Sequence, residues 1–305
     1  MRSHGAAPPD DRKYVASMKR STAISGIMAS LFIGTFIGWA GSNGSVEVAK
    51  VPVFAVCALV AYLINWVAFV PSYRARTEAF YDLTGSATYL TLTTLALLLS
   101  DLDGRAFLVA GLVSVWALRL GTFLFRRVKR DGGDGRFDAI KCDPVQFFMS
   151  WSVQALWVLL TLACGLAAIT GAERQPLGAS AALGALVWIS GFAIEATADR
   201  QKSAFKADPA NDGRFISTGL WAWSRHPNYF GEITLWVGIA IIALPVLSGW
   251  RLATLISPVF VYILLTRVSG IPLLERRAQK RWGNDPAFQS YTDNTPALIP
   301  RPPRT

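Results

Sequence analysis

The chain has 305 residues, of which 52% are hydrophobic and only 16% are charged, and its formal net charge is +10. Soluble domains carry about 25% charged residues, so this composition argues against soluble domains and favours a polytopic membrane protein. Three cysteines without a CxxC motif, together with two histidines, provide no metal-ligand spacing, and we expect no metal site.

Long apolar runs recur along the chain, and each is long enough to cross a hydrocarbon core about 30 Å thick. None shows the period-two alternation of a membrane β-barrel, so we expect helices. The sequence therefore predicts an all-α, polytopic integral membrane protein with about eight transmembrane helices. The expected spans are 22–40, 51–70, 83–100, 106–125, 151–170, 178–198, 229–248 and 251–267.

The basic residues indicate the orientation of these spans. With the N-terminus inside, 25 of the 30 lysines and arginines fall in internal segments and four in external segments. We therefore expect both termini to be cytoplasmic. The net charge then reflects topology and contact with membrane lipids, and no nucleic acid partner is expected. We expect a basic, flexible tail over 1–21, one transmembrane helical domain over 22–298 and a C-terminal tail over 299–305.

The fourth span leaves the membrane in "WALRLGTFLFRRVKRDGGDGRFD", where Arg119, Arg126, Arg127 and Arg130 share one helical face. The last three residues could be interfacial anchors that extend toward lipid headgroups. Arg119 lies about two turns inside the apolar segment, where a charge usually faces a wet cavity or a partner.

The sixth span ends in "GFAIEATADRQKSAFKADP", which places Glu195, Asp199, Lys202 and Lys206 on one helical stripe. One interpretation is a set of ion pairs on an exit helix. Because Glu195 lies inside the apolar run, we favour a ligand whose hydrogen-bond donors lie deep and whose anionic end lies shallow.

The seventh span begins at "SRHPNYFGE", where we expect Asn228 to cap the helix, with Tyr229 and Glu232 on one face. Arg225 and His226 at a helix N-terminus form a potential anion site. Four helix ends thus bring basic side chains to one depth, which suits a ligand with several phosphates or a carboxylate. These side chains are Arg126, Arg127, Arg130, Lys202, Lys206, Arg225, His226 and Arg267.

The stretches "TGLWAWSRHPNYFGE" and "LLTRVSGIPLLERR" resemble the bacterial membrane family of unknown function 1295, which is related to the C-terminal domain family of steroid 5-alpha-reductases (3-oxo-5-alpha-steroid 4-dehydrogenases). The resemblance covers 113–282, the expected cofactor-binding part. It implies a bacterial inner-membrane oxidoreductase that uses NADPH to saturate a conjugated C=C bond of a lipophilic enone drawn from the bilayer.

The same resemblance implies roles for individual residues. Asn228 and Glu232 would lie beside the nicotinamide, and Arg267 near the phosphates. The residues expected to bind the cofactor are Arg119, Arg127, Arg130, Glu195, Asp199, Lys202, Lys206, Arg225, His226, Asn228, Tyr229, Arg267 and Glu275.

The proton donor of the steroid enzymes has no direct counterpart. Their tyrosine corresponds to Trp116, and the early segment "FYDLTGSATYL" offers Tyr81, Asp82 and Tyr89 in place of a glutamate. We expect Asp82 or Tyr81 to supply the proton, the alternative being an interfacial Tyr–Asp pair. The catalytic candidates are Asp82, Tyr81, Trp116 and Glu232.

A second enzyme class shares part of this pattern. "RHPNYFG" is similar to the RHPxYxG signature of membrane methyltransferases of the isoprenylcysteine carboxyl and phospholipid types, which use S-adenosylmethionine and carry an acidic pair where this chain has Glu275. S-adenosylmethionine has no phosphate and would leave most of the cations unmatched, so the reductase is favoured. A non-enzymatic lipid-binding role is the third alternative.

Overall fold

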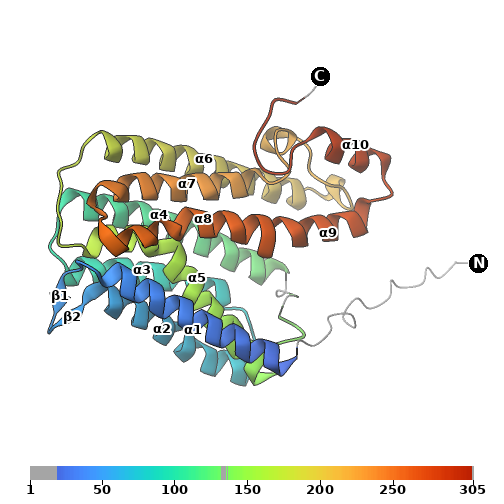
Figure 1. Ribbon diagram of the computed structural model, residues 1–305. Coiled ribbons are helices and arrows are strands. Elements are labelled where there is room, and N and C mark those ends of the chain that lie inside the picture. Colours follow the sequence, from blue (N-terminus) through green and yellow to red (C-terminus); the bar gives the residue numbers. More distant parts are fainter. Residues whose placement is uncertain (1–18, 132–134, 136, 304–305) are drawn as a thin grey trace, which may run out of the picture.

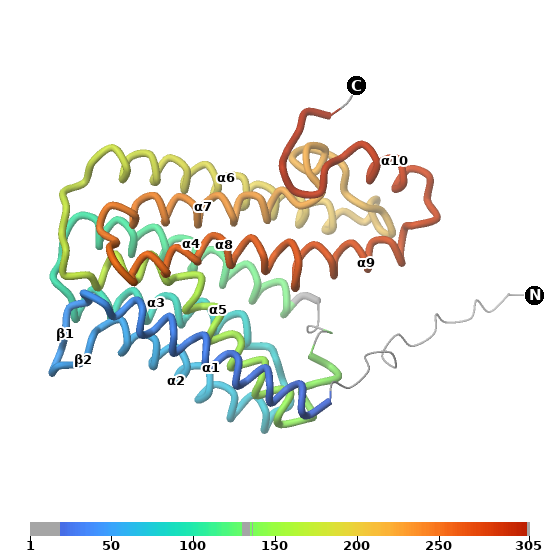
Figure 2. Tube along the Cα trace, in the orientation of Figure 1, coloured from blue at the N-terminus to red at the C-terminus, as the bar shows by residue number. Residues whose placement is uncertain are grey.

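The computed structural model describes residues 19–131, 135 and 137–303, without the side chains of Arg130 and Asp131. Most of the predicted N-terminal tail therefore lies outside the described residues. The long helices form a bundle, shown as a ribbon in Figure 1 and as a tube in Figure 2. They are α1 (Arg20–Ser42), α2 (Val53–Ala75), α3 (Tyr81–Leu99), α4 (Gly104–Asp131), α5 (Pro144–Thr170), α6 (Ala179–Ala207), α7 (Pro227–Ala243), α8 (Ile256–Ile263), α9 (Ile271–Trp282) and α10 (Pro286–Asn294).

Short elements connect these helices. The strands β1 (Glu47–Val48) and β2 (Val51–Pro52) form an antiparallel hairpin between α1 and α2. The 3-10 helices are η2 (Pro209–Asn211), η3 (Gly219–Ala222), η4 (Leu244–Val246) and η5 (Gly249–Leu255), and α8 continues into the π-helix η6 (Leu264–Val268). The predicted eighth span, 251–267, is thus a succession of three helix types and not one regular α-helix.

Seven helical stretches of the described chain are long and apolar enough to cross a membrane: 20–42, 53–75, 104–129, 144–170, 179–207, 227–246 and 249–282. They confirm a helical membrane protein. The predicted third span forms α3, which has 19 residues and is not among the seven. Its five threonines lower its hydropathy, and the hydroxyls of four of them donate to backbone carbonyls of the preceding turn, as that of Thr88 does to the carbonyl of Thr84.

Helix α5 forms the centre of the bundle and is buried over most of its length. It packs against α1, α2, α3, α4 and α8. Helices α6 and α7 form a tightly packed pair on the other side of α4 and α8, as Figure 1 shows. The candidate residues on α4, α6 and α7 therefore belong to neighbouring helices.

Glycines set the distance between α6 and α7. A Cβ atom on Gly191 would lie 2.6 Å from the carbonyl oxygen of Gly231, and one on Gly238 would lie 2.6 Å from that of Gly184. Small residues at such contacts let helix backbones approach closely in a membrane. A Cβ atom on Gly231 would also lie 2.6 Å from the backbone nitrogen of Glu195. This contact therefore places Glu195 directly beside the first turns of α7.

Two buried arginines lie at the hairpin end of the bundle. Arg105 donates to the carbonyl oxygen of Ile242 in the last turn of α7, and Arg251 donates to that of Ala167 in the last turn of α5, at 2.5 Å. A cation at a helix C-terminus offsets the helix dipole and satisfies carbonyl groups that have no partner within the helix. These two of the four predicted external cations therefore have a structural role.

At the opposite end, α9, α10 and the C-terminal segment cover the segment that precedes α7 (Figure 1). The backbone N–H of Arg225 donates to the carbonyl oxygen of Pro296 at 2.9 Å, and the N–H of Arg301 donates to that of Trp223 at 2.9 Å. Part of the predicted C-terminal tail is thus bound to the bundle, and it holds the start of α7 in place.

Candidate functional site

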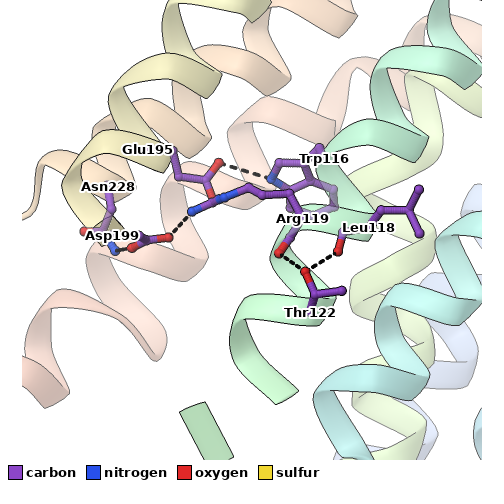
Figure 3. Close-up of polar contacts among 7 residues, drawn as sticks. All are labelled: Trp116, Leu118, Arg119, Thr122, Glu195, Asp199 and Asn228. Atoms are coloured by element: carbon purple, nitrogen blue, oxygen red, sulfur yellow. Dashed lines mark hydrogen bonds and ion pairs between the residues drawn. The ribbon is translucent and has the colours of Figure 1, made fainter. Parts of the chain in front are cut away.

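Arg119 is the centre of a polar network between α4, α6 and α7 (Figure 3). Its guanidinium group donates to Glu195 Oε1 at 2.5 Å and also to Asp199 Oδ2. The indole Nε1 of Trp116 donates to the other carboxylate oxygen of Glu195 at 3.2 Å. Arg119 and Glu195 thus meet inside the bundle. The position of each charge within an apolar segment had indicated that it faces a cavity or a partner.

Asn228 joins this network from α7. Its Nδ2 atom donates to Asp199 Oδ1 at 3.2 Å (Figure 3). The prediction that Asn228 caps the helix is wrong, because α7 begins two residues earlier than that cap implies and His226 occupies the cap position. Proline is well suited to the first position of a helix, where no N–H is required, so Pro227 starts the helix. The Asn228 amide is therefore available to the carboxylate of Asp199.

A hollow of about 390 Å³ opens between α4 and α6 beside the network. Its size lies within the usual range of small-molecule sites, about 300–1,000 Å³. Its lining is basic, since Arg126, Arg127 and Arg200 surround the paired Arg119 and Asp199. Arg126 and Arg200 are exposed, so the hollow is basic at its mouth and holds a neutralised ion pair at its base.

The two proposed proton donors of α3 have different surroundings. Asp82 Oδ2 lies 3.8 Å from Arg127 Nη2, which places Asp82 at the edge of the hollow. The hydroxyl of Tyr81 donates to the carbonyl oxygen of Ser150 at 2.9 Å, and its ring packs against Trp151 of α5. Asp82 therefore lies near the candidate site, whereas the Tyr81 side chain is directed toward α5.

Lys202 connects the hollow to the start of α7. Its Nζ atom lies 4.3 Å from the ring centroid of Trp221, and it is within electrostatic reach of Arg127, Lys206 and His226. Three of the predicted helix ends thus contribute to one basic region. Lys206 itself is exposed.

The motif residues Arg225 and His226 both contact Glu275 of α9. Glu275 Oε1 lies 2.9 Å from Arg225 Nη2 and 3.5 Å from His226 Nε2. The imidazole ring also stacks on Tyr229, with 5.6 Å between the ring centroids. Burial lowers the pKa of His226 below its ordinary value, in spite of the nearby carboxylate of Glu275.

Two predicted cofactor residues are not part of these contacts. Arg267 is exposed within the π-helix η6, and it is not among the residues that line the hollow. The side chain of Arg130 lies outside the described part of the structure. The predicted contribution of a fourth helix end to the basic region thus remains a prediction.

Glu232 lies in the second turn of α7, within electrostatic reach of Glu195, Asp199 and Arg119. On its other side is Tyr89 of α3, whose buried ring packs edge-on against Trp116 at 5.1 Å. The Tyr89 hydroxyl lies near that of Thr161 but forms no hydrogen bond with the described residues. Two buried hydroxyl groups without a hydrogen-bond partner among the described residues, those of Tyr89 and Thr161, therefore lie near the network.

The family described as "Protein of unknown function (DUF1295)" matches residues 68–295, which cover α3 to α10 and therefore every site residue described above. The chain belongs to this family. The DUF1295 match confirms the family resemblance predicted from the motif of α7 and the segment around α9, and it extends the resemblance toward the N-terminus beyond residue 113.

The DUF1295 chain is also similar to an uncharacterised protein of Schizosaccharomyces pombe (strain 972 / ATCC 24843). The two are 25% identical over 234 residues, and the match covers 65% of this chain. The matched region spans 64% of the length of that curated relative. No solved structure matches the chain.

Sequence reasoning missed two features of this DUF1295 site. The first is Arg200, which lines the hollow. Its position directly after Asp199 on the same helix is a signal that could have indicated it. The ion pair between Arg119 and the carboxylates of α6 joins residues about 80 positions apart, and no local pattern predicts that contact.

Proposed function

We propose that this protein is a membrane-embedded, NADPH-dependent reductase that saturates a conjugated C=C bond of a lipophilic enone. The basic hollow between α4 and α6 carries the proposal, because it combines three arginines at its mouth with a network of hydrogen-bond donors and acceptors at its base. This arrangement matches a ligand with several phosphates at one end and an uncharged carboxamide at the other.

The residues present fit this cofactor. Guanidinium groups bind phosphate oxygens through paired, charge-assisted hydrogen bonds, so Arg126, Arg127 and Arg200 would hold the phosphates. Asp199, which lines the hollow, and Asn228, whose Nδ2 atom donates to Asp199 at 3.2 Å, would orient the nicotinamide end. When bound, NADPH supplies the hydride for the reduction of the double bond.

Tyr89 is the group of this chain best placed to deliver the proton. Its phenol is buried beside Trp116 and Glu232 and has no hydrogen-bond partner among the described residues. Asp82 is held by Arg127, and Tyr81 by the backbone of α5. A donor next to the reacting carbonyl would stabilise the enolate that develops during the reduction.

The proposal includes an eight-span topology with α3 as the third span and both termini in the cytoplasm. In this orientation the hollow, which lies toward the ends of α4 and α6 that carry the basic residues, opens to the cytoplasm, where the cofactor is present. The substrate would enter from the bilayer. The proposed location is a bacterial inner membrane, in which the positive-inside rule would place the basic segments on the cytoplasmic side.

One observation favours the second candidate, an S-adenosylmethionine-dependent membrane methyltransferase. The two stretches that resemble the methyltransferase signature meet in space, because Arg225 and His226 contact Glu275. That contact lies away from the lining of the hollow. A ligand without phosphate would leave Arg126, Arg127 and Arg200 unmatched, so the reductase accounts for more of the site.

Nucleotide binding to the purified full chain in detergent tests the proposal. NADPH is expected to bind with a Kd in the micromolar range that rises with ionic strength, because phosphate contacts are screened by salt. Arg127→Ala should weaken binding about tenfold or more, as expected for a charge-assisted contact. Arg74→Ala is the matched control, since Arg74 is an exposed arginine at the end of α2.

Two results would contradict the reductase. Stabilisation by S-adenosylmethionine without any response to NADPH would establish the methyltransferase instead. A protein that responds to neither ligand would favour the non-enzymatic, lipid-binding role.

A further inference from the structure

The arginines that line the hollow differ in how their charge is balanced. Arg119 pairs with two carboxylates of α6, and Arg127 lies 3.8 Å from Asp82. Arg126 and Arg200 also line the hollow, are exposed, and form no ion pair with any residue that the structure describes. The mouth of the hollow therefore presents two positive charges that the residues around it do not neutralise.

These two side chains lie near the end of membrane-crossing stretches. Arg126 is three residues from the end of the stretch 104–129, and Arg200 is seven residues from the end of the stretch 179–207. An arginine in such a position keeps its stem in apolar surroundings and extends its charge toward the lipid headgroups. The mouth of the hollow is thus level with the headgroups of one leaflet.

Toward the centre of the membrane, the helix faces that line the hollow continue as exposed apolar residues. Val115 of α4 lies four residues before Arg119 and is 50% exposed. Ile189 of α6 lies seven residues before Ala196, which also lines the hollow, and is 54% exposed. Residues at these spacings share a helix face. The hollow therefore adjoins an apolar face that acyl chains can cover.

Aromatic rings flank the ion pair at the base of the hollow. The guanidinium carbon of Arg119 lies 5.7 Å from the ring centroid of Phe123 and 5.9 Å from that of Phe192. Such contacts place apolar ring surface beside a charge that is already paired. A ligand that extends from the mouth of the hollow toward the centre of the membrane thus meets free charge at one end and hydrocarbon at the other.

We infer that the hollow and the adjoining apolar face bind an anionic membrane lipid, with its headgroup phosphate at Arg126 and Arg200 and an acyl chain along Val115 and Ile189. A zwitterionic lipid carries its own cation beside the phosphate, whereas an anionic headgroup neutralises the arginines through charge-assisted hydrogen bonds. The inference goes beyond the proposed reductase and does not depend on it. If NADPH uses the same arginines, the lipid competes with it, and the lipid composition of the membrane sets the apparent affinity for the dinucleotide.

Lipid binding to the full chain, delipidated in a non-ionic detergent, tests the inference, because a neutral micelle attracts no anions of its own. Phosphatidylglycerol should bind about tenfold more tightly than phosphatidylcholine with the same acyl chains, as counted by native mass spectrometry. The double variant Arg126→Gln/Arg200→Gln should bind the two lipids equally. The double variant Arg74→Gln/Arg76→Gln is the matched control and should retain the preference, because it removes two exposed arginines at the end of α2, at the same end of the bundle.

A soluble competitor separates a lipid site from a site for any small anion. Glycerophosphoglycerol is the same headgroup without acyl chains, so it gains nothing from the apolar face. It should displace bound phosphatidylglycerol only at a concentration about a hundredfold higher than the intact lipid requires. Equal potency of the two would overturn the inference, because the ligand would then need the arginines alone.

The remaining outcomes separate the lipid site from the reductase. A wild-type protein that prefers neither lipid, a preference that survives in Arg126→Gln/Arg200→Gln, or an equal loss in the control variant overturns the lipid site and leaves the reductase standing. Shared arginines predict that phosphatidylglycerol raises the Kd of NADPH about tenfold and that phosphatidylcholine does not. A Kd of NADPH that phosphatidylglycerol leaves unchanged would contradict the role of these arginines in the reductase and leave the lipid site standing.

Discussion

Arg119 neutralises charge at the point where three helices meet. Its side chain is 19% exposed, and those of its partners Glu195 and Asp199 are 3% and 9% exposed. Burying charges is costly, and the cost is recovered only where the ionic geometry and the remaining hydrogen bonds are satisfied. Trp116 and Asn228 provide those additional hydrogen bonds. The network is therefore sensitive to the loss of any one member.

Arg119→Met should destabilise the folded protein strongly. It keeps most of the apolar stem but leaves two buried carboxylates without their cation, and the loss of one partner of a buried ion pair typically costs about 3–5 kcal/mol. The melting temperature in detergent measures the effect. Arg126→Met, at an exposed arginine of the same helix, should change it little, and an equal effect of the two substitutions would contradict the central role of Arg119.

The buried imidazole of His226 should make the stability depend on pH. Burial lowers its pKa in the folded protein, whereas in the unfolded chain it takes up a proton near its ordinary pKa of about 6.5. Below that pH the unfolded state binds more protons, so acid favours unfolding. The contribution of His226 to stability is therefore present above about pH 6.5 and is lost as the pH falls.

Melting curves between pH 5.5 and 7.5 test this expectation. His226→Gln cannot titrate, and its melting temperature should fall less over this interval than that of the wild-type protein. Parallel curves for the two proteins would show that folding leaves the pKa of His226 unchanged, which would contradict the prediction.

At the scale of the helices, the contact between α6 and α7 determines where the site residues lie. The glycine pairs Gly184–Gly191 and Gly231–Gly238 have the same spacing of seven residues, so each helix presents two glycines on nearly the same face. Their backbones approach closely enough to bring Asp199 beside Asn228. The geometry of the polar network therefore depends on the absence of side chains at these four positions.

Gly191→Ala should destabilise the protein and weaken any ligand binding in the hollow. The added Cβ atom would lie 2.5 Å from the backbone nitrogen of Leu235, and backbone cannot move aside as a flexible side chain can. Overpacking of this kind typically costs about 1–3 kcal/mol. Gly111→Ala in α4 is the control, because its Cβ atom would meet no atom within 4 Å and alanine favours helix. Equal melting temperatures for the two variants would contradict the proposed contact.

The sequence was informative about the helices and about the charges that face the bundle interior. The apolar runs predicted the helices α1 to α7, and the position of Glu195 within such a run indicated its internal partner. The sequence could not predict which helices are neighbours, and therefore neither the ion pair of Arg119 nor the hollow. The start of α7 was misplaced by two residues, because asparagine is a favoured cap residue whereas proline is favoured at the first helical position, and here Pro227 decides where the helix begins.

The whole molecule has two different ends. The hairpin end carries short connections and the buried arginines Arg105 and Arg251, whose guanidinium groups bind helix carbonyls. The other end carries α9, α10, the longer connections and the basic hollow (Figure 1). An asymmetry of this kind fits a protein that exchanges a soluble, anionic ligand with one compartment only. The orientation of the bundle in the membrane therefore decides which compartment the hollow faces.

Thiol labelling of intact cells can determine this orientation. Cys142 is exposed in the connection between α4 and α5, whereas Cys57 and Cys164 are buried in the bundle. With the hollow facing the cytoplasm, a membrane-impermeant maleimide should label Cys142 only after the membrane is permeabilised. Lys50→Cys at the exposed hairpin, in a Cys142→Ser background, should be labelled without permeabilisation. The reverse pattern would place the hollow outside, where NADPH is absent, and would remove the basis for the reductase.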